Sequence, residues 1–165
     1  PAVLELRGAS GGRSIELKTA RLFSAAAEAA AILAGFALPL RRRAAGLGRE
    51  LGLTFQLRDD MLDYGLEGRE TKTLGQDFRN RFLTLPLLFL VRATGISWRA
   101  LARLSWREAA RLMREEGIPA RMEERRALHL ARAARCFRGL PALFPGGPAA
   151  TILRGLGLFF PARAK

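Results

Sequence analysis

The sequence predicts an all-α fold, and three observations support that prediction. Apolar residues recur every three or four positions over long stretches, proline and glycine fall between those stretches, and no segment alternates as a strand does. With 165 residues, 49% of them hydrophobic, the chain is long enough to bury one core. We therefore expect a single domain over residues 1–165, with residues 1–13 as a loose entry segment.

The first predicted helix covers residues 15–38. Ser14 precedes it as a suitable N-cap, and Pro39 is expected to end it. Its many alanines, together with Gly35, permit close contact with neighbouring helices, which is typical of a buried helix.

The second predicted helix starts at the arginine triplet 41–43 and runs through residues 55–64, where Gly65 and Gly68 close it. We interpret the triplet as a solvated helix start rather than a binding patch. Residues 66–81 are polar and are expected to form a loop, and a loop of that length in a compact domain is usually functional or disordered.

The rest of the chain predicts four more helices. The first covers residues 83–91, with Pro86 in its first turns, where a missing N–H costs little. The next is capped by Ser97 and carries apolar residues from Trp98 to Met113 on one face. The last two cover residues 120–138 and 149–160, with a turn-rich break between them.

Cysteine and histidine are each present once. A single Cys136 excludes an internal disulfide, and a single His129 excludes a His/Cys metal site within the chain. Both lack partners for a site, so we interpret them as ordinary helix residues. No apolar run is long enough for a transmembrane segment, and the start of the chain lacks the pattern of a signal peptide. A cytoplasmic location fits best.

The net charge of +13 is a reason to consider nucleic acid or an anionic membrane as a partner. Residues 1–86 hold 13 Lys+Arg and 10 Asp+Glu, whereas residues 87–165 hold 15 and 5, so most of the excess lies in the second half. The arginines there are spread along apolar helices rather than interleaved with aromatic residues. We interpret them as a solvated surface and expect no nucleic-acid partner.

An aspartate-rich stretch lies within the second predicted helix. Residues three and four apart share a helix face, so one polar stripe is expected, backed by Phe55 and the leucines and methionine around it. The stripe consists of Gln56, Asp59, Asp60 and Asp63. Carboxylates roughly 6 Å apart repel one another by about 3 kcal/mol per pair at an effective dielectric near 20. Such a cluster needs a cation, and carboxylate oxygens suit Mg²⁺. The alternative is a solvated acidic face.

Lysines flank this stretch on both sides. The chain has three lysines among its 28 basic residues, and the two internal ones are Lys18 and Lys72. Lysine supplies a compact, rotatable charge suited to a phosphate oxygen. Antiparallel packing of the first two helices would bring Lys18 near the aspartates.

The order Lys-Thr-Ala, Phe-Gln-x-x-Asp-Asp-x-x-Asp, Lys, Gly-x-Asp and Thr-Leu-Pro, from Lys18 to Pro86, resembles the C-terminal half of a trans-isoprenyl diphosphate (polyprenyl) synthase. The resemblance is strong over residues 14–91. It implies about half of an isoprenoid-synthase-type helical bundle. It also implies a prenyltransferase that extends an allylic diphosphate with isopentenyl diphosphate and uses Mg²⁺ as cofactor.

The resemblance also implies roles for individual residues. Asp59, Asp60 and Asp63 correspond to the second aspartate-rich motif, which holds Mg²⁺ against the allylic diphosphate. Lys18, with Thr19 beside it, and Lys72 correspond to lysines that contact the diphosphate. Gln56 corresponds to a glutamine next to the metal motif.

The sequence departs from the family pattern in two ways. Nothing before Lys18 carries the paired aspartates of the first motif. In addition, Arg81 and Phe82 stand where the family often has Gly-Lys, and Thr71 replaces a frequent glycine. We therefore expect no prenyl transfer by this chain alone. Two explanations stay open: the sequence is a fragment of a full synthase, or the chain works in a homo- or hetero-oligomer in which another chain supplies the first motif.

Three hypotheses remain at this stage. The chain is a prenyltransferase-family half that binds Mg²⁺ and diphosphate, a non-catalytic subunit that stabilises or regulates a synthase, or a basic helical nucleic-acid binder. The sequence favours them in that order.

Overall fold

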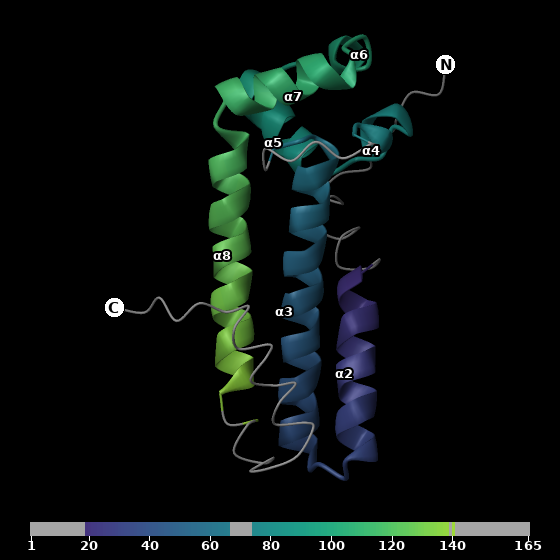
Figure 1. The fold of residues 1–165 in the computed structure, drawn as a ribbon, viewed down its shortest axis with the longest axis vertical. Coiled ribbons are helices and arrows are strands. Elements are labelled where there is room, and N and C mark those ends of the chain that lie inside the picture. The colour runs from purple at the N-terminus through teal and green to yellow at the C-terminus, as the bar shows by residue number, and fades with distance from the viewer. Residues whose placement is uncertain (1–18, 67–73, 139, 141–165) are drawn as a thin grey trace. The chain divides into compact units, whose positions relative to one another are not determined.

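The computed structural model describes residues 19–66, 74–138 and 140, and every regular element in them is a helix (Figure 1). The all-α prediction is confirmed. The predicted entry segment and the predicted helix over residues 149–160 lie outside the described residues.

The described residues fall into two compact units. The first, here called the aspartate unit, comprises Phe55–Arg126; the second, the alanine unit, comprises residues 19–54 and 127–140. Helices α3 (Leu38–Asp63) and α8 (Ile118–Phe137) each contribute residues to both units.

The alanine unit contains α2 (Arg21–Leu33) and the first part of α3. The expected helix over residues 15–38 is wrong at its C-terminal end. The chain turns at Gly35, whose φ of +71° is left-handed, and Pro39 lies in the first turn of α3 instead of ending α2. Proline is tolerated there because the first N–H groups of a helix have no intrahelical partner.

Two glycines of α3 let α2 approach closely. A Cβ at Gly48 would lie 2.3 Å from the Phe23 backbone oxygen, and one at Gly52 would lie 2.8 Å from the Ala20 Cα. The expectation that the alanine-rich helix is buried is wrong, because Ala31 is the only buried residue of α2. The close contact uses one side of the helix and leaves the rest open.

The start of α3 agrees with the interpretation of the arginine triplet. Arg42 and Arg43 are exposed, and Arg43 donates from Nη1 to the Arg138 carbonyl oxygen over 2.9 Å. Further along, Leu47 packs with Ala133 and Leu140 in a small core.

His129 of α8 has a partner that the sequence did not reveal. Its Nδ1 lies 2.6 Å from Oε2 of Glu50, and both side chains are buried. Arg49 donates to the other carboxylate oxygen of Glu50 over 2.9 Å. His129 is thus a helix residue, as interpreted, and it forms a buried pair that the sequence did not reveal.

The aspartate unit contains four helices besides its parts of α3 and α8. They are α4 (Gln76–Arg79), α5 (Leu85–Thr94), α6 (Trp98–Leu101) and α7 (Trp106–Glu115). Pro86 lies in the first turn of α5 and Ser97 caps α6, both as predicted. The single helix expected after Ser97 is wrong, because Ser105 starts a second one.

A capping box explains the division between α6 and α7. Ser105 Oγ accepts from the Glu108 N–H over 3.3 Å, and Glu108 Oε2 accepts from the Ser105 N–H over 2.7 Å. This reciprocal pair satisfies two backbone donors that a helix start leaves without partners. The buried residues of the aspartate unit include Tyr64, Leu57 and Met113.

Candidate diphosphate and magnesium site

The aspartates lie in the last turns of α3, inside the aspartate unit. The predicted helix over this stretch is confirmed, since α3 ends at Asp63 and Gly65 follows with a φ of +61°. The stripe does not share one environment, however. Asp60 is buried, Gln56 and Asp63 are half-buried, and Asp59 is exposed.

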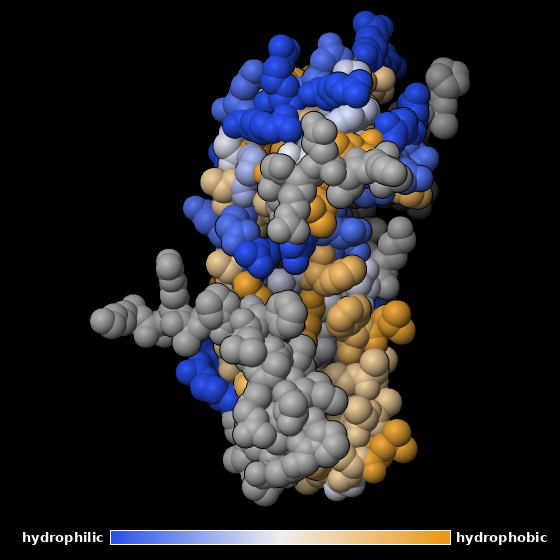
Figure 2. Space-filling model, in the orientation of Figure 1, coloured by the Kyte–Doolittle hydropathy of each residue, from blue (hydrophilic) through white to orange (hydrophobic). Residues whose placement is uncertain are grey.

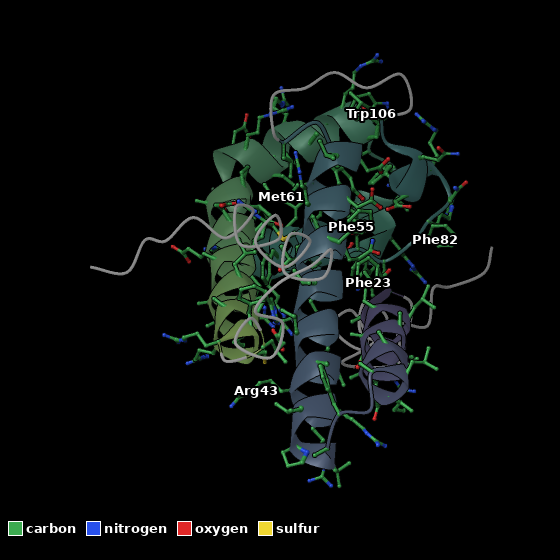
Figure 3. All side chains as sticks on the ribbon, turned by 60° about the horizontal axis from the view of Figure 1, so that its bottom comes forward. Phe23, Arg43, Phe55, Met61, Phe82 and Trp106 are labelled. Atoms are coloured by element: carbon green, nitrogen blue, oxygen red, sulfur yellow. The ribbon has the colours of Figure 1, made fainter. Side chains whose placement is uncertain are left out.

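The apolar backing is partly as expected. Leu57 and Met61 are buried beneath the stripe, whereas Phe55 is exposed, so its assignment to the backing is wrong (Figure 3). Phe55 precedes Asp59 by four residues and shares its helix face. An aromatic ring and a carboxylate therefore lie together on the open side of α3.

Asp60 is a buried carboxylate whose hydrogen-bond donors, among the described residues, are neutral. Its side chain is 2% exposed, Oδ1 accepts from Gln56 Nε2 over 2.9 Å, and Oδ2 faces the Leu85 N–H at 3.4 Å. Burial raises its pKa to about 6, and the Asp77 and Asp59 carboxylates act in the same direction. Among the described residues no arginine, lysine or histidine forms an ion pair with it.

Asp63 forms hydrogen bonds with the backbone at the start of α4. Its Oδ1 accepts from the Gln76 N–H over 2.9 Å, and its Oδ2 accepts from the Asp77 N–H over 3.0 Å. The Gly75 N–H donates to the Asp63 backbone oxygen over 2.6 Å. The Asp63 carboxylate thus caps α4, which has no capping side chain of its own.

This capping places the Gly-x-Asp residues against the end of α3. Gly75 is required there, because its φ is +74° and a Cβ would lie 2.3 Å from Cγ of Trp106. The expected loop over residues 66–81 therefore contains a helical turn, and residues 67–73 lie outside the described part.

The Thr-Leu-Pro segment supplies a second support that sequence reasoning missed. Thr84 Oγ1 lies 3.3 Å from the Tyr64 hydroxyl, and both are buried. Burial raises the pKa of Tyr64, which keeps its phenol neutral. The contact fixes the start of α5 beside α3, where the Leu85 N–H faces Asp60.

The structure gives less information on the positions of the remaining predicted site residues. Lys18 and Lys72 lie outside the described residues, so the expected approach of Lys18 to the aspartates is not described. Thr19 is half-buried at the start of the alanine unit. Gln56 is held by its bond to Asp60.

The donor chemistry of this region fits Mg²⁺. Its carboxylates come from Asp59, Asp60, Asp63 and Asp77, and each Asp63 oxygen that accepts one N–H keeps a second lone pair. Within the described residues, no three acidic, histidine or cysteine side chains converge closely enough to hold a metal ion by themselves. The donors therefore form part of a site, which other oxygens would have to complete.

The aspartate-rich helix end, the capped Gly-x-Asp turn and the Thr-Leu-Pro helix start thus lie together in one helical unit. Residues 12–110 match the family model described as polyprenyl synthetase, and the chain belongs to that family. The resemblance seen in the sequence is confirmed.

Individual relatives agree with this assignment. The chain is 47% identical over 77 residues to the octaprenyl diphosphate synthase of Escherichia coli (strain K12), covering 46% of this chain and 24% of that protein. It is 42% identical over 90 residues to the (2E,6E)-farnesyl diphosphate synthase of Mycobacterium tuberculosis (strain ATCC 25618 / H37Rv), covering 53% and 24%.

Solved structures show the same fold. A decaprenyl diphosphate synthase from Rhodobacter capsulatus matches with a TM-score of 0.74 and 27% identity, over 93% of this chain and 49% of that one. A polyprenyl synthase from Roseobacter denitrificans matches with a TM-score of 0.63 and 27% identity, over 91% and 51%. The chain thus spans about half of these structures, and about a quarter of the curated relatives is matched. The prediction of half an isoprenoid-synthase bundle is confirmed.

None of the helices in the described residues combines the length and apolar character that crossing a bilayer requires.

Proposed function

We propose that this chain forms the diphosphate-binding half of a trans-prenyltransferase, which extends an allylic diphosphate with isopentenyl diphosphate. Asp59, Asp60 and Asp63 would hold Mg²⁺, while Lys18 and Lys72 would contact the diphosphate. The first aspartate-rich motif would come from another polypeptide segment, in an oligomer or in a longer chain. The proposal includes a cytoplasmic location.

One observation supports the proposal above all others. The Asp60 carboxylate is buried next to two further carboxylates, and its hydrogen-bond donors among the described residues are both neutral. A buried charge without a counter-charge is costly unless a cation completes its environment. An ordinary solvated acidic face would not bury the central carboxylate of the motif.

The residues around Asp60 would have defined roles in this reaction. Gln56 and the Leu85 N–H orient the Asp60 carboxylate, and Asp63 keeps Asp77 close to it. Mg²⁺, when bound, stabilises the negative charge that grows on the departing diphosphate. Apolar helices around the site would exclude water, which otherwise quenches the allylic cation.

Calorimetry with the purified chain tests this proposal. Farnesyl diphosphate should bind in the presence of Mg²⁺, and Asp59→Asn or Asp60→Asn should weaken binding about 10- to 100-fold, as for losses at other metal sites. Glu124→Gln is the matched control, because Glu124 is an exposed carboxylate of α8 within the same unit. Equal binding by all four proteins would refute the proposal.

A second assay distinguishes a catalytic half of a prenyltransferase from a non-catalytic subunit that regulates one. The chain alone should not turn over farnesyl and isopentenyl diphosphates. A reconstituted pair of chains should do so, and should lose turnover with Asp60→Asn. A pair that keeps full turnover with Asp60→Asn would favour the non-catalytic subunit instead.

A further inference from the structure

An arginine-rich surface lies at the end of the aspartate unit that α6 and α7 form. Residues 92–114 contain six arginines and one acidic residue, Glu108. All six arginines are exposed: Arg92, Arg99, Arg103, Arg107, Arg111 and Arg114. Figure 2 shows hydrophilic residues gathered over the helices that Figure 1 labels α6 and α7. We call these six residues the arginine surface.

A short repeat in the sequence builds part of this surface. An apolar residue, a serine, a tryptophan and an arginine follow one another twice, at residues 96–99 and 104–107. Ser97 and Ser105 cap the two helices, and each accepts a hydrogen bond from the backbone N–H three residues further on, over 3.2 and 3.3 Å. The tryptophan is therefore the first residue of its helix and the arginine the second. Both tryptophans of the chain are half-buried among these arginines.

The acidic groups near the arginine surface already have partners. The Glu108 carboxylate accepts from the backbone N–H and from the hydroxyl of Ser105, over 2.7 Å each. Glu115 pairs with Arg111 at 3.7 Å, and an exposed pair of this kind contributes little. None of the other five arginines forms an ion pair with another described residue. The surface therefore carries a positive charge that nearby acids do not balance.

Such a surface is unsuited to packing within a helical bundle. Charged residues are depleted at the centre of protein interfaces, because each buried charge must lose its hydration. The apolar side of α7 is already buried through Ala109, Ala110 and Met113. The arginines at positions 107, 111 and 114 recur at i, i+4 and i+7 and so share another side of that helix. The arginine surface thus suits an anionic partner rather than a further helix.

The tryptophans favour a lipid surface over a nucleic acid. Proteins that bind single-stranded nucleic acid offer open aromatic faces on which the bases stack. Trp106 is instead packed against backbone, because a Cβ at Gly75 would lie 2.3 Å from its Cγ, and Arg107 Cζ lies 5.0 Å from its ring centroid. Partly buried tryptophans beside arginines that reach into water are typical of the headgroup layer of a membrane.

We propose that the arginine surface binds the headgroups of an anionic bilayer. The contact is electrostatic, with Trp98 and Trp106 at headgroup level and no helix inserted, since the apolar side of α7 is already packed. The choice of a lipid surface rests on the proposed function, because the product of prenyl elongation carries an apolar chain that partitions into a bilayer. Binding there would let that product leave directly into lipid.

Co-sedimentation of the complete chain with vesicles tests the proposal. Vesicles of equal parts phosphatidylglycerol and phosphatidylcholine should bind the chain, whereas pure phosphatidylcholine should not. Raising the salt from about 0.1 M to about 1 M shortens the Debye length from about 10 Å to about 3 Å and should release the chain. Because both tryptophans of the chain lie at this surface, their emission should shift to shorter wavelength on binding.

The variant Arg99→Gln/Arg103→Gln/Arg107→Gln should weaken binding to the anionic vesicles about 100-fold, since each basic residue near a membrane surface contributes about fivefold. Replacing the same three arginines by lysine keeps the charge and should keep the binding. All three side chains are exposed, so the circular dichroism spectrum should not change. The lipid and salt dependence of the wild type tests the proposal even if the glutamine variant does not fold.

The matched control is Arg125→Gln/Arg132→Gln/Arg135→Gln. It removes the same charge from exposed positions of α8 that lie outside the arginine surface. Binding to the anionic vesicles should weaken less than about threefold, because charges beyond a Debye length from the headgroups are screened.

Several results would overturn the proposal. They are no binding to anionic vesicles at low salt, equal binding to phosphatidylcholine alone, equal losses in the two glutamine variants, and binding without a change in tryptophan emission. Tighter binding of a single-stranded RNA oligonucleotide than of the vesicles at the same salt would assign the surface to nucleic acid instead.

This assay contains neither Mg²⁺ nor a prenyl diphosphate, so its outcome is independent of the proposed function. Failure of vesicle binding would leave the diphosphate site standing. Vesicle binding by a chain that does not bind farnesyl diphosphate in calorimetry would leave the lipid-binding surface standing and refute the proposed function.

Discussion

Two buried carboxylates on α3, ten residues apart, have contrasting surroundings. In the alanine unit, Oε1 of Glu50 accepts from Arg49 Nη1 over 2.9 Å, and Oε2 lies 2.6 Å from Nδ1 of His129. From the described residues, Asp60 in the aspartate unit accepts hydrogen bonds from a side-chain amide and a backbone N–H. Within the part of the chain that the structure describes, the same helix thus carries one carboxylate with basic partners and one without.

This difference indicates that the two carboxylates have different roles. Removing a carboxylate that pairs with a buried base leaves that base without its partner, which destabilises the fold. A carboxylate that the fold buries without such a partner is costly, and a ligand can offset that cost. We therefore assign Glu50 to stability and Asp60 to binding, and the predictions below test that division.

The largest effect is expected from Glu50→Ala. Removing this carboxylate leaves His129 buried without its acceptor, so the free energy of unfolding should fall by about 3 kcal/mol. Glu50→Gln, which keeps an acceptor for His129, should cost less. Denaturant titration followed by circular dichroism measures both. A loss below about 1 kcal/mol for Glu50→Ala would show that the pair is not structural.

A smaller effect with a defined pH range is expected at Asp60. Its pKa is about 6 in the folded chain, against 3.8 as the ordinary value, so the folded state favours the protonated acid. Without Mg²⁺, this residue should add up to about 3 kcal/mol to the free energy of unfolding as the pH falls through 6 towards 4.

Comparison with Asp60→Asn isolates this contribution. The variant keeps the volume of the side chain and lacks the titrating group, so its profile should lack the rise seen in the wild type between pH 6 and pH 4. Urea unfolding at several pH values measures it. Parallel profiles for the two proteins would contradict the view that Asp60 is a buried charge without a partner.

The smallest effect is expected at Arg81, between α4 and α5. Its φ of +57° makes it the only non-glycine residue with left-handed φ in the described part of the chain. It stands where the family often has glycine. Arg81→Gly should stabilise the chain by about 0.5–1 kcal/mol, because a side chain in this region is strained. Arg79→Gly, inside α4, is the control and should destabilise it.

Local patterns in the sequence predicted much of this structure. Pro86 and Ser97 fix helix starts through backbone chemistry that operates within one turn. The aspartate-rich helix end followed from spacing alone. The exposure of α2 could not be predicted, because alanine is equally compatible with a buried helix face and an exposed one.

Contacts between distant residues were harder to predict. The capping of α4 by Asp63 spans 13 and 14 residues, and the bond between Glu50 and His129 spans 79. No local pattern encodes such pairs. A signal was nonetheless present for Glu50, because an acid three residues after Leu47 on an apolar helix face needs a buried partner.

The most direct measurement is a carboxyl ¹³C NMR titration of Asp60 in the complete chain, with and without Mg²⁺ and inorganic pyrophosphate. In the free chain the carboxyl should titrate with a pKa of about 6. Bound Mg²⁺ and pyrophosphate should lower that pKa towards its ordinary range, because a cation favours the ionised form. A pKa that stays the same under saturating Mg²⁺ and pyrophosphate would contradict the assignment of Asp60 to the binding site.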